Sequence, residues 1–136
     1  LNNSINDNFN ELRDVALIGN KNKTNKLLSE TVIEDENNVY YLSLLNHRLH
    51  KLKEFNILKN NNENYEITLS KMKPPIFWKD KEIFIQQANK WSEKNIQKAL
   101  KKTFDIEIDL KSNPSIKKNL LIKNLIVDLC QEANSA

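Results

Sequence analysis

A stripe of large apolar residues between positions 38 and 59 constrains the fold of this chain most strongly. Such residues recur there at alternating steps of three and four: Leu42, Leu45, Leu49, Leu52, Phe55 and Leu58. This spacing places them on one face of a helix, with Asn46, His47, Lys51 and Lys53 expected to face mostly away from it. About 20 residues make a rod of roughly 30 Å. Because so long a helix cannot bury its stripe alone, shorter helices before and after it must pack against it.

The scarcity of glycine points to the same fold class. Gly19 is the only glycine in 136 residues, whereas β-sheet proteins need many glycines in their turns. We therefore predict an all-α fold, a single compact bundle of five to six helices around one long central helix. It forms one domain over residues 1–136, with 1–6 and 133–136 frayed. Since the chain begins without Met, we expect it to be a fragment of a longer protein.

Capping and stop signals divide the N-terminal half. A first helix is capped by Asp7 and ends at Gly19, and a second runs from Lys21 to Ile33, burying Leu27, Leu28 and Val32. The long helix ends in the asparagines at 60–62. Residues 64–73 are predicted to be a loop with one helical turn.

The C-terminal half contains three further predicted helices. A fourth runs from about 79 to 90, a fifth begins at the cap Ser92, and a last one starts at Asn113-Pro114 and reaches about residue 132. Apolar and acidic residues alternate from Phe104 to Leu110, as in a strand. Because no turn residue precedes them, we predict that the fifth helix continues through them to about residue 111.

Charge and cysteine content restrict the class of protein only loosely. The net charge of +3 is mild and arises from mixed signs, so it does not by itself indicate a nucleic-acid-binding protein. Cys130 is the only cysteine, which excludes an internal disulfide and fits a reducing compartment. No signal peptide and no membrane-spanning run is evident. The chain is therefore predicted to be cytoplasmic and not to contact a membrane.

Few residues could carry catalysis. A single glycine cannot build a phosphate-binding loop or a dinucleotide fingerprint. His47 and His50, with Glu54 one turn further on, could share a zinc ion, but the neighbouring Arg48 and Lys51 oppose this. Solvated histidines are the favoured interpretation.

The remaining candidates for catalysis are also weak. Cys130 lies in an apolar helical stretch and is expected to be a packed core thiol. Asp105, Glu107 and Asp109 would fan around a helix as a solvated face rather than form an acid–base pair. We predict no catalytic residue, no metal site and no cofactor, and therefore no enzyme activity for this domain.

A cluster of lysines and aromatic residues is the most informative polar feature. Lys71, Lys73, Lys79 and Lys81 surround the run Pro74-Pro75-Ile76-Phe77-Trp78. In one interpretation, bases of single-stranded nucleic acid stack on Trp78 while the lysines contact phosphates. In the other, which the residue pattern alone favours, Phe77 and Trp78 fill the core at a chain turn. The candidate nucleic-acid residues are Trp78, Lys73, Lys79 and Lys81.

Three segments together resemble a known family. They are VALIGNKNKTNKLLSETVIEDENNVYYLSLLNHRLHKL from position 15, KPPIFWKDK from position 73, and IDLKSNP from position 108. Their order and spacing are similar to the C-terminal domain of the delta subunit of the bacterial DNA polymerase III clamp loader. The resemblance covers about residues 7–131 and includes Gln87 and Trp91. The asparagine-rich loop at 60–64 and the strand-like run at 104–110 depart from the family pattern.

The resemblance implies a role in assembly during DNA replication. In this family the helical domain packs with its counterparts into a collar, holding the pentamer that places the sliding clamp on primed DNA. The implied partners are the ATP-binding subunits (gamma or tau) and delta prime, with template DNA contacted indirectly. The sliding clamp would be contacted only through domains outside this chain, and the parent holoenzyme is a DNA-directed DNA polymerase, a nucleotidyltransferase.

Tyr40 and Ile57, which lie off the leucine stripe, are the candidate subunit-interface residues. The alternative is a stand-alone helical domain that binds single-stranded nucleic acid.

Overall fold

The leucine stripe forms the centre of the structure. The computed structural model describes residues 3–59 and 64–135, and within them α3 (Asn38–Leu58) is the longest helix. Leu42, Leu45, Leu49 and Leu52 are all buried, with Leu45 and Leu49 completely inaccessible to solvent. The prediction of a long helix that buries this stripe is therefore confirmed.

Six further α-helices surround α3. They are α1 (Asn3–Ile18), α2 (Lys21–Glu30), α4 (Tyr65–Lys71), α5 (Lys81–Ala88), α6 (Glu93–Ser112) and α7 (Lys118–Ala133). The short 3₁₀ turns η1 (Asp35–Asn37) and η2 (Trp78–Asp80) precede α3 and α5. The described residues contain no strand, which confirms the all-α prediction. These residues form seven α-helices rather than five to six, because much of the segment predicted as a loop forms α4.

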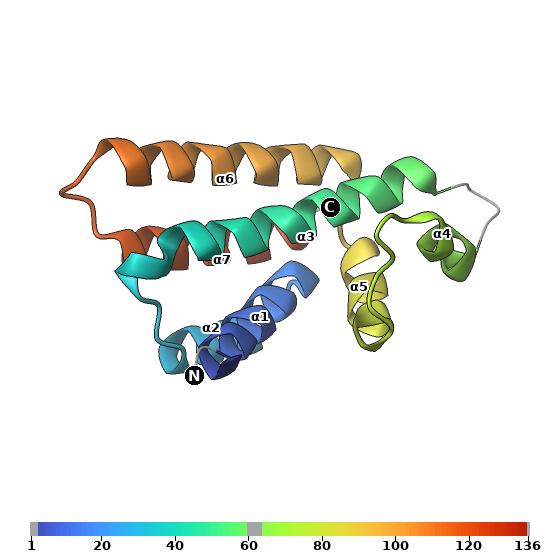
Figure 1. Ribbon diagram of the computed structural model, residues 1–136, viewed down its shortest axis with the longest axis horizontal. Helices are drawn as coiled ribbons and strands as arrows, with labels where there is room; N and C mark the ends of the chain where they lie inside the picture. The colour runs from blue at the N-terminus through green and yellow to red at the C-terminus, as the bar shows by residue number, and fades with distance from the viewer. Residues whose placement is uncertain (1–2, 60–63, 136) are drawn as a thin grey trace.

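The helices pack around both sides and one end of α3. α6 runs alongside α3, and α7 packs against α3, α6 and α1 (Figure 1). α2 completes the bundle by contacting α1 and α7, while α4 and α5 pack against the C-terminal half of α3. The segment between α4 and α5 is therefore held beside the end of the central helix.

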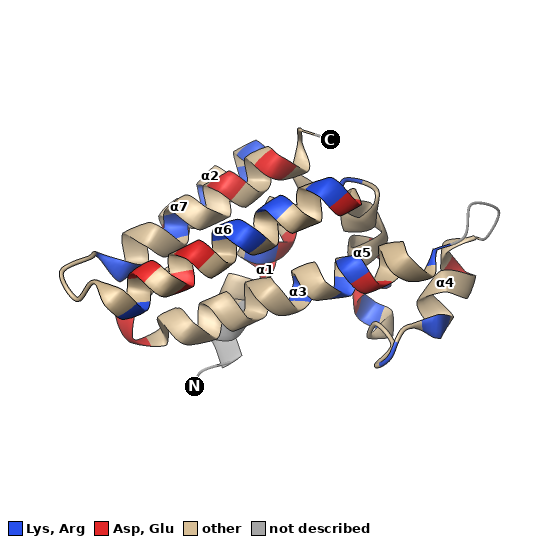
Figure 2. Ribbon diagram, turned by 90° about the horizontal axis from the view of Figure 1, so that it is seen from above, with Lys and Arg blue, Asp and Glu red and all other residues tan. Residues whose placement is uncertain are grey.

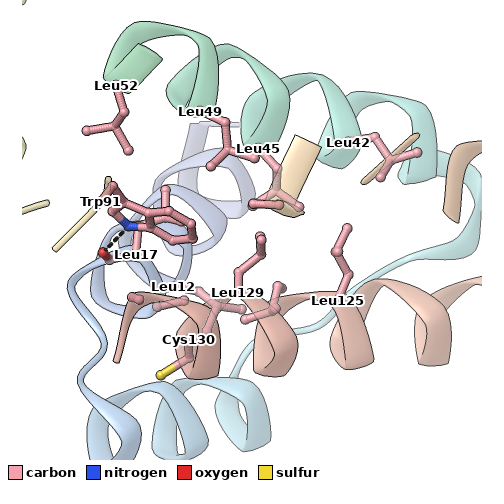
Figure 3. Packing of buried hydrophobic residues seen from close by; sticks show 14 of the residues in the cluster. Leu12, Leu17, Leu42, Leu45, Leu49, Leu52, Trp91, Leu125, Leu129 and Cys130 are labelled. Atoms are coloured by element: carbon pink, nitrogen blue, oxygen red, sulfur yellow. Dashed lines mark hydrogen bonds between the residues drawn. The ribbon is translucent and has the colours of Figure 1, made fainter. Parts of the chain in front are cut away.

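The core joins α3 to the helices opposite it. In Figure 3, Leu42, Leu45 and Leu49 point across the bundle towards Leu125 and Leu129 of α7. Trp91 is buried beside them, and its indole N–H donates to the carbonyl oxygen of Leu17 at 2.8 Å. That carbonyl lies at the C-terminal end of α1, where helix carbonyls lack partners within the helix. The buried ring therefore also completes the hydrogen bonding of a helix end.

Local sequence signals explain several helix ends. Asn20, Asn64 and Ser92 each cap the following helix through a side-chain oxygen that accepts a backbone N–H. Gly19 adopts a positive φ of 84°, as the predicted stop requires, and a Cβ there would lie 2.6 Å from the Asn134 side chain. Residues 104–110 are helical, so the fifth predicted helix does continue through the alternating run.

Three predicted boundaries are wrong. α1 begins at Asn3, so Asp7 lies inside the helix rather than at its cap. α2 ends at Glu30, which leaves Val32 70% exposed instead of buried. α7 begins at Lys118, because the Asn113 side chain accepts from the backbone N–H and hydroxyl of Ser115 and so closes a turn instead of capping a helix.

Truncating the centre of the stripe should strongly destabilise the fold. Leu49 is fully buried, so Leu49→Ala removes apolar contacts and leaves a cavity. We expect it to lower the free energy of unfolding by about 2–5 kcal/mol, measured by urea denaturation followed by circular dichroism. Val32→Ala, at an exposed apolar position, should change it by less than about 0.5 kcal/mol. Equal effects of the two variants would contradict the position of α3.

Candidate functional site

The proline elbow, residues 73–81 between α4 and α5, is attached to α3 by two charged side chains. The Lys51 ammonium donates to the carbonyl oxygen of Pro74 at 2.7 Å. Glu54 Oε2 accepts the backbone N–H of Lys73 at 2.9 Å, and Glu54 Oε1 accepts from Lys51 at 3.1 Å. The Lys73–Pro74 peptide bond is cis. The start of the elbow is thus held by a closed set of charge-assisted hydrogen bonds.

Lys51 does not face solvent as predicted, since only 8% of the residue is exposed. A lysine can be buried in this way when its aliphatic stem packs on the core and its ammonium group finds oxygen partners. Here the partners are Glu54 and the Pro74 carbonyl. The prediction failed because Pro74 lies 23 residues further along the chain, where helical periodicity gives no information.

The Glu54 carboxylate is stabilised in its charged form. Burial on its own would raise the pKa of Glu54. The hydrogen bonds from the Lys73 N–H and from Lys51, together with the Lys51 charge, outweigh burial and hold the pKa below its ordinary value. The attachment of the elbow therefore depends on an ionised glutamate.

The elbow presents two aromatic rings to solvent. Phe77 is 57% exposed and Trp78 is 68% exposed, so the interpretation that both rings fill the core is wrong, and the Trp78 ring is exposed as the alternative interpretation requires. Met72 and Phe84, which flank the elbow in the sequence, belong to the core instead, and Ile76 is partly buried against it. The centroids of the Phe77 and Trp78 rings lie 5.9 Å apart, and together these residues form the aromatic pair.

The lysines around the aromatic pair are less available than the sequence suggests. The Lys79 ammonium lies 5.4 Å from the centroid of the Trp78 ring, within cation–π range. Lys81 pairs with Glu66 of α4 at 3.4 Å. Asp80 and Glu82 add negative charge on either side of Lys81. The four candidate nucleic-acid residues therefore all lie on the elbow, but the positive rim around Trp78 is partly neutralised.

The two candidate subunit-interface residues are exposed but separated. Tyr40 is 42% exposed and Ile57 is 72% exposed. Both belong to α3, and their separation of 17 positions corresponds to roughly 25 Å along the helix. They cannot form one contact patch, so each would have to contact a different part of a partner.

The histidines and acidic residues considered for metal or acid–base chemistry lie on α3 and α6. Within residues 3–59 and 64–135, no three His, Cys, Asp or Glu side chains are arranged to hold a metal ion. Burial, followed by the charges of Lys51 and Arg48, lowers the pKa of His47. On α6, acidic and basic residues interleave as Figure 2 shows, and Asp105 pairs with Lys101 at 3.1 Å. Glu107 pairs in the same way with Lys111 at 2.9 Å.

Cys130 is a packed thiol, as predicted, and is only 3% exposed. In Figure 3 it points away from the leucines and towards α2. The thiol is therefore buried in the region where α7 packs against α2.

Sequence reasoning missed a buried polar network between α1, α3 and α5. Asp14 accepts from Arg13 at 2.8 Å, and Arg48 lies 3.9 Å away from the same carboxylate oxygen. Arg48 also donates to Gln87 at 2.9 Å, and Gln87 donates to the backbone carbonyl of Asp14 at 3.2 Å. Arg13 and Arg48 are the only arginines of the chain, and both are buried. The rarity of arginine was the only feature of the sequence that could have singled out these two residues.

Comparisons with known proteins found no relative of this chain. No protein family, curated protein or solved structure matches this chain. The resemblance to the clamp-loader delta subunit therefore stays a prediction. Among the helices formed by residues 3–59 and 64–135, none combines the length and the apolar character needed to cross a bilayer.

The two tryptophans should respond oppositely to truncation. Trp78→Ala removes an exposed ring and should change the free energy of unfolding by less than about 0.5 kcal/mol. Trp91→Ala removes a buried ring together with its hydrogen bond to Leu17, and should cost about 3–5 kcal/mol. Denaturant unfolding of both variants measures this. A sharp loss of stability in Trp78→Ala would show that the elbow ring belongs to the core.

Removing the charge of Glu54 should weaken the elbow attachment in a pH-dependent way. Because the folded-state pKa of Glu54 is depressed, its contribution is complete above the ordinary pKa of a glutamate, about 4.3. It is lost as the pH falls through the lower folded-state value. At pH ~7, Glu54→Gln should therefore cost about 1 kcal/mol.

The pH profile provides the internal control for this prediction. The stability difference between Glu54→Gln and the unaltered chain should shrink as the pH falls towards about 3. Val32→Ala, which truncates an exposed side chain and changes no titratable group, should show no such trend. A difference for Glu54→Gln that stays constant from neutral to acid pH would mean that its carboxylate charge does not hold the elbow.

Proposed function

We propose that this chain is a non-catalytic helical interaction domain, and specifically the collar domain of a clamp-loader delta subunit. The observation that carries the interaction role is the exposed aromatic pair on an elbow anchored to the central helix. Large aromatic rings displayed in solvent are typical of surfaces that bind partners. Because Lys51 and Glu54 hold the start of the elbow in place, less conformational freedom should be lost when a partner binds.

The collar assignment is supported by the resemblance of residues 7–131, together with an all-α architecture suited to such a role. In this proposal the chain is one domain of a longer cytoplasmic subunit. It binds the ATP-binding subunits (gamma or tau) and delta prime, while other domains contact the sliding clamp. Tyr40, Ile57 and the aromatic pair are candidate contacts, distributed over different parts of the surface.

A second candidate function is binding of single-stranded nucleic acid at the elbow. Trp78 is exposed and has Lys79 against its ring, an arrangement that can stack a base while placing a cation near a phosphate. The Lys81–Glu66 pair and the neighbouring acidic residues reduce this attraction. We therefore place nucleic-acid binding second to protein binding.

Reconstitution of the clamp loader tests the proposed function. Deleting residues 7–131 from the parent subunit should remove it from the pentamer in a sedimentation experiment. Phe77→Ala combined with Trp78→Ala should weaken its association with the other subunits by about ten-fold or more. Val32→Ala, which removes an exposed apolar side chain elsewhere, serves as the matched control. An intact pentamer after the deletion would contradict the assembly role.

The same reconstituted complex separates the two candidates. If Trp78 stacks on template, Trp78→Ala should leave the pentamer assembled and weaken primer–template binding by roughly ten-fold. Lys79→Ala should then lower the dependence of binding on salt by about one counterion or less. If DNA binding by an assembled Trp78→Ala complex is unchanged, the nucleic-acid function is excluded.

A further inference from the structure

A groove beside the C-terminal half of α3 lies next to the elbow but does not include the aromatic pair. It has a volume of about 420 Å³ and is lined by His50, Lys53, Glu54, Ile57, Leu58, Lys71 and Lys73. These residues come from α3, from the end of α4 and from the start of the elbow. Two of its lining residues are thus fixed relative to each other by the hydrogen bond between Glu54 and Lys73.

The charge on the groove is mainly positive. Among the lining residues that the structure describes, three are lysines and one is a glutamate, and that glutamate already accepts from Lys51, which lies outside the lining. Among the residues that the structure describes, neither the Lys53 nor the Lys73 ammonium group has a carboxylate within ion-pair distance. The groove therefore offers at least two cations that a bound carboxylate could contact.

The apolar part of the groove is aliphatic. Ile57 is 72% exposed, and Leu58 beside it is half-buried. Ile57 and Lys53 also line a second, smaller hollow of about 120 Å³ between α3 and α6, together with Ile96. Ile57 thus stands between two hollows, and a side chain entering either one would contact it.

We propose that this groove binds an acidic peptide segment of a partner protein, one that carries a large aliphatic anchor residue. The anchor packs on Ile57 and Leu58, and flanking carboxylates contact Lys53 and Lys73. Charge complementarity favours the acidic residues, and the Ile57 and Leu58 side chains favour the aliphatic anchor. The inference shares Ile57 with the proposed function but goes beyond it, because the site excludes Phe77 and Trp78 and does not require a clamp loader.

Protein is favoured over nucleic acid as the occupant. Sequence-tolerant binding of single strands depends on aromatic faces on which bases stack, and none of the described residues of this lining is Phe, Tyr or Trp. Burial of an aliphatic anchor uses the exposed Ile57 side chain, whereas a phosphate backbone would leave it in water. An oligonucleotide is nevertheless included in the test as the competing ligand.

Fluorescence anisotropy with defined peptides tests the proposal. The probe is a labelled peptide with two adjacent leucines flanked by glutamates, and its matched control carries lysines in place of the glutamates. The chain should bind the acidic probe saturably and the basic one at least ten-fold more weakly. Lys53→Glu and Ile57→Ala should each weaken binding of the acidic probe by about ten-fold. Circular dichroism of each variant verifies that its helical fold is retained.

Two matched variants and a competitor make the outcomes decisive. Lys98→Glu reverses an exposed lysine of α6 that does not line the groove, and Val32→Ala truncates an exposed apolar residue elsewhere. Both should bind the acidic probe normally.

The proposal is overturned if the probe does not bind at about 1 mM, or if Lys53→Glu and Ile57→Ala bind as well as these controls. Displacement of the probe by an unlabelled thymidine oligonucleotide would also overturn it, by showing that phosphates occupy the groove. None of these outcomes bears on whether residues 7–131 are needed for the pentamer.

Discussion

The burial of α3 is the constraint on which the rest of the structure depends. Its apolar stripe contributes four inaccessible or nearly inaccessible leucines, and α1, α4, α5, α6 and α7 all pack against it. A helix enclosed on so many sides also brings polar side chains into the core. Arg48 and Lys51 are buried for this reason, and each requires partners from another part of the chain.

Those partners link the core to the surface. Arg48 donates a hydrogen bond to Gln87 of α5 and lies near Asp14 of α1. Lys51 donates to Glu54 and to the Pro74 carbonyl. The same hydrogen bonds that satisfy buried charges therefore fix α5 and the elbow against α3. As a result, Phe77 and Trp78 are displayed by a segment anchored at its start to α3 and followed by a helix anchored to the core. Interactions that stabilise the fold and those that position the candidate site are largely the same.

Features that depend on residues close together in sequence were predictable. The spacing of Leu42 to Leu52 predicted the central helix, Gly19 predicted a helix stop, and the absence of a turn residue before Phe104 predicted a continuous α6. The all-α class followed from the scarcity of glycine. In each case the physical cause, helical periodicity or the backbone freedom of glycine, acts over a few residues.

The candidate site was only partly predictable, because distant contacts decide it. The elbow and its lysines were recognised, but Phe77 and Trp78 are exposed, whereas Met72 and Phe84 on either side of them in the sequence are buried in the core. Lys51 is buried because the chain brings Pro74 to it. Neither the Lys81–Glu66 pair nor the groove around Ile57 can be derived from spacing, since each combines residues of different helices. Burial of this kind depends on how helices pack, which periodicity alone does not determine.

We propose that this domain binds partners through the elbow and the neighbouring end of α3 while its core stays unchanged. Hydrogen-exchange mass spectrometry on the parent subunit, free and in the reconstituted clamp loader, tests it most directly. We expect slower backbone exchange in the complex at residues 73–81 and in the adjoining end of α3, with α2 unaffected. Protection confined to α2, or no difference between the free and assembled subunit, would contradict this account.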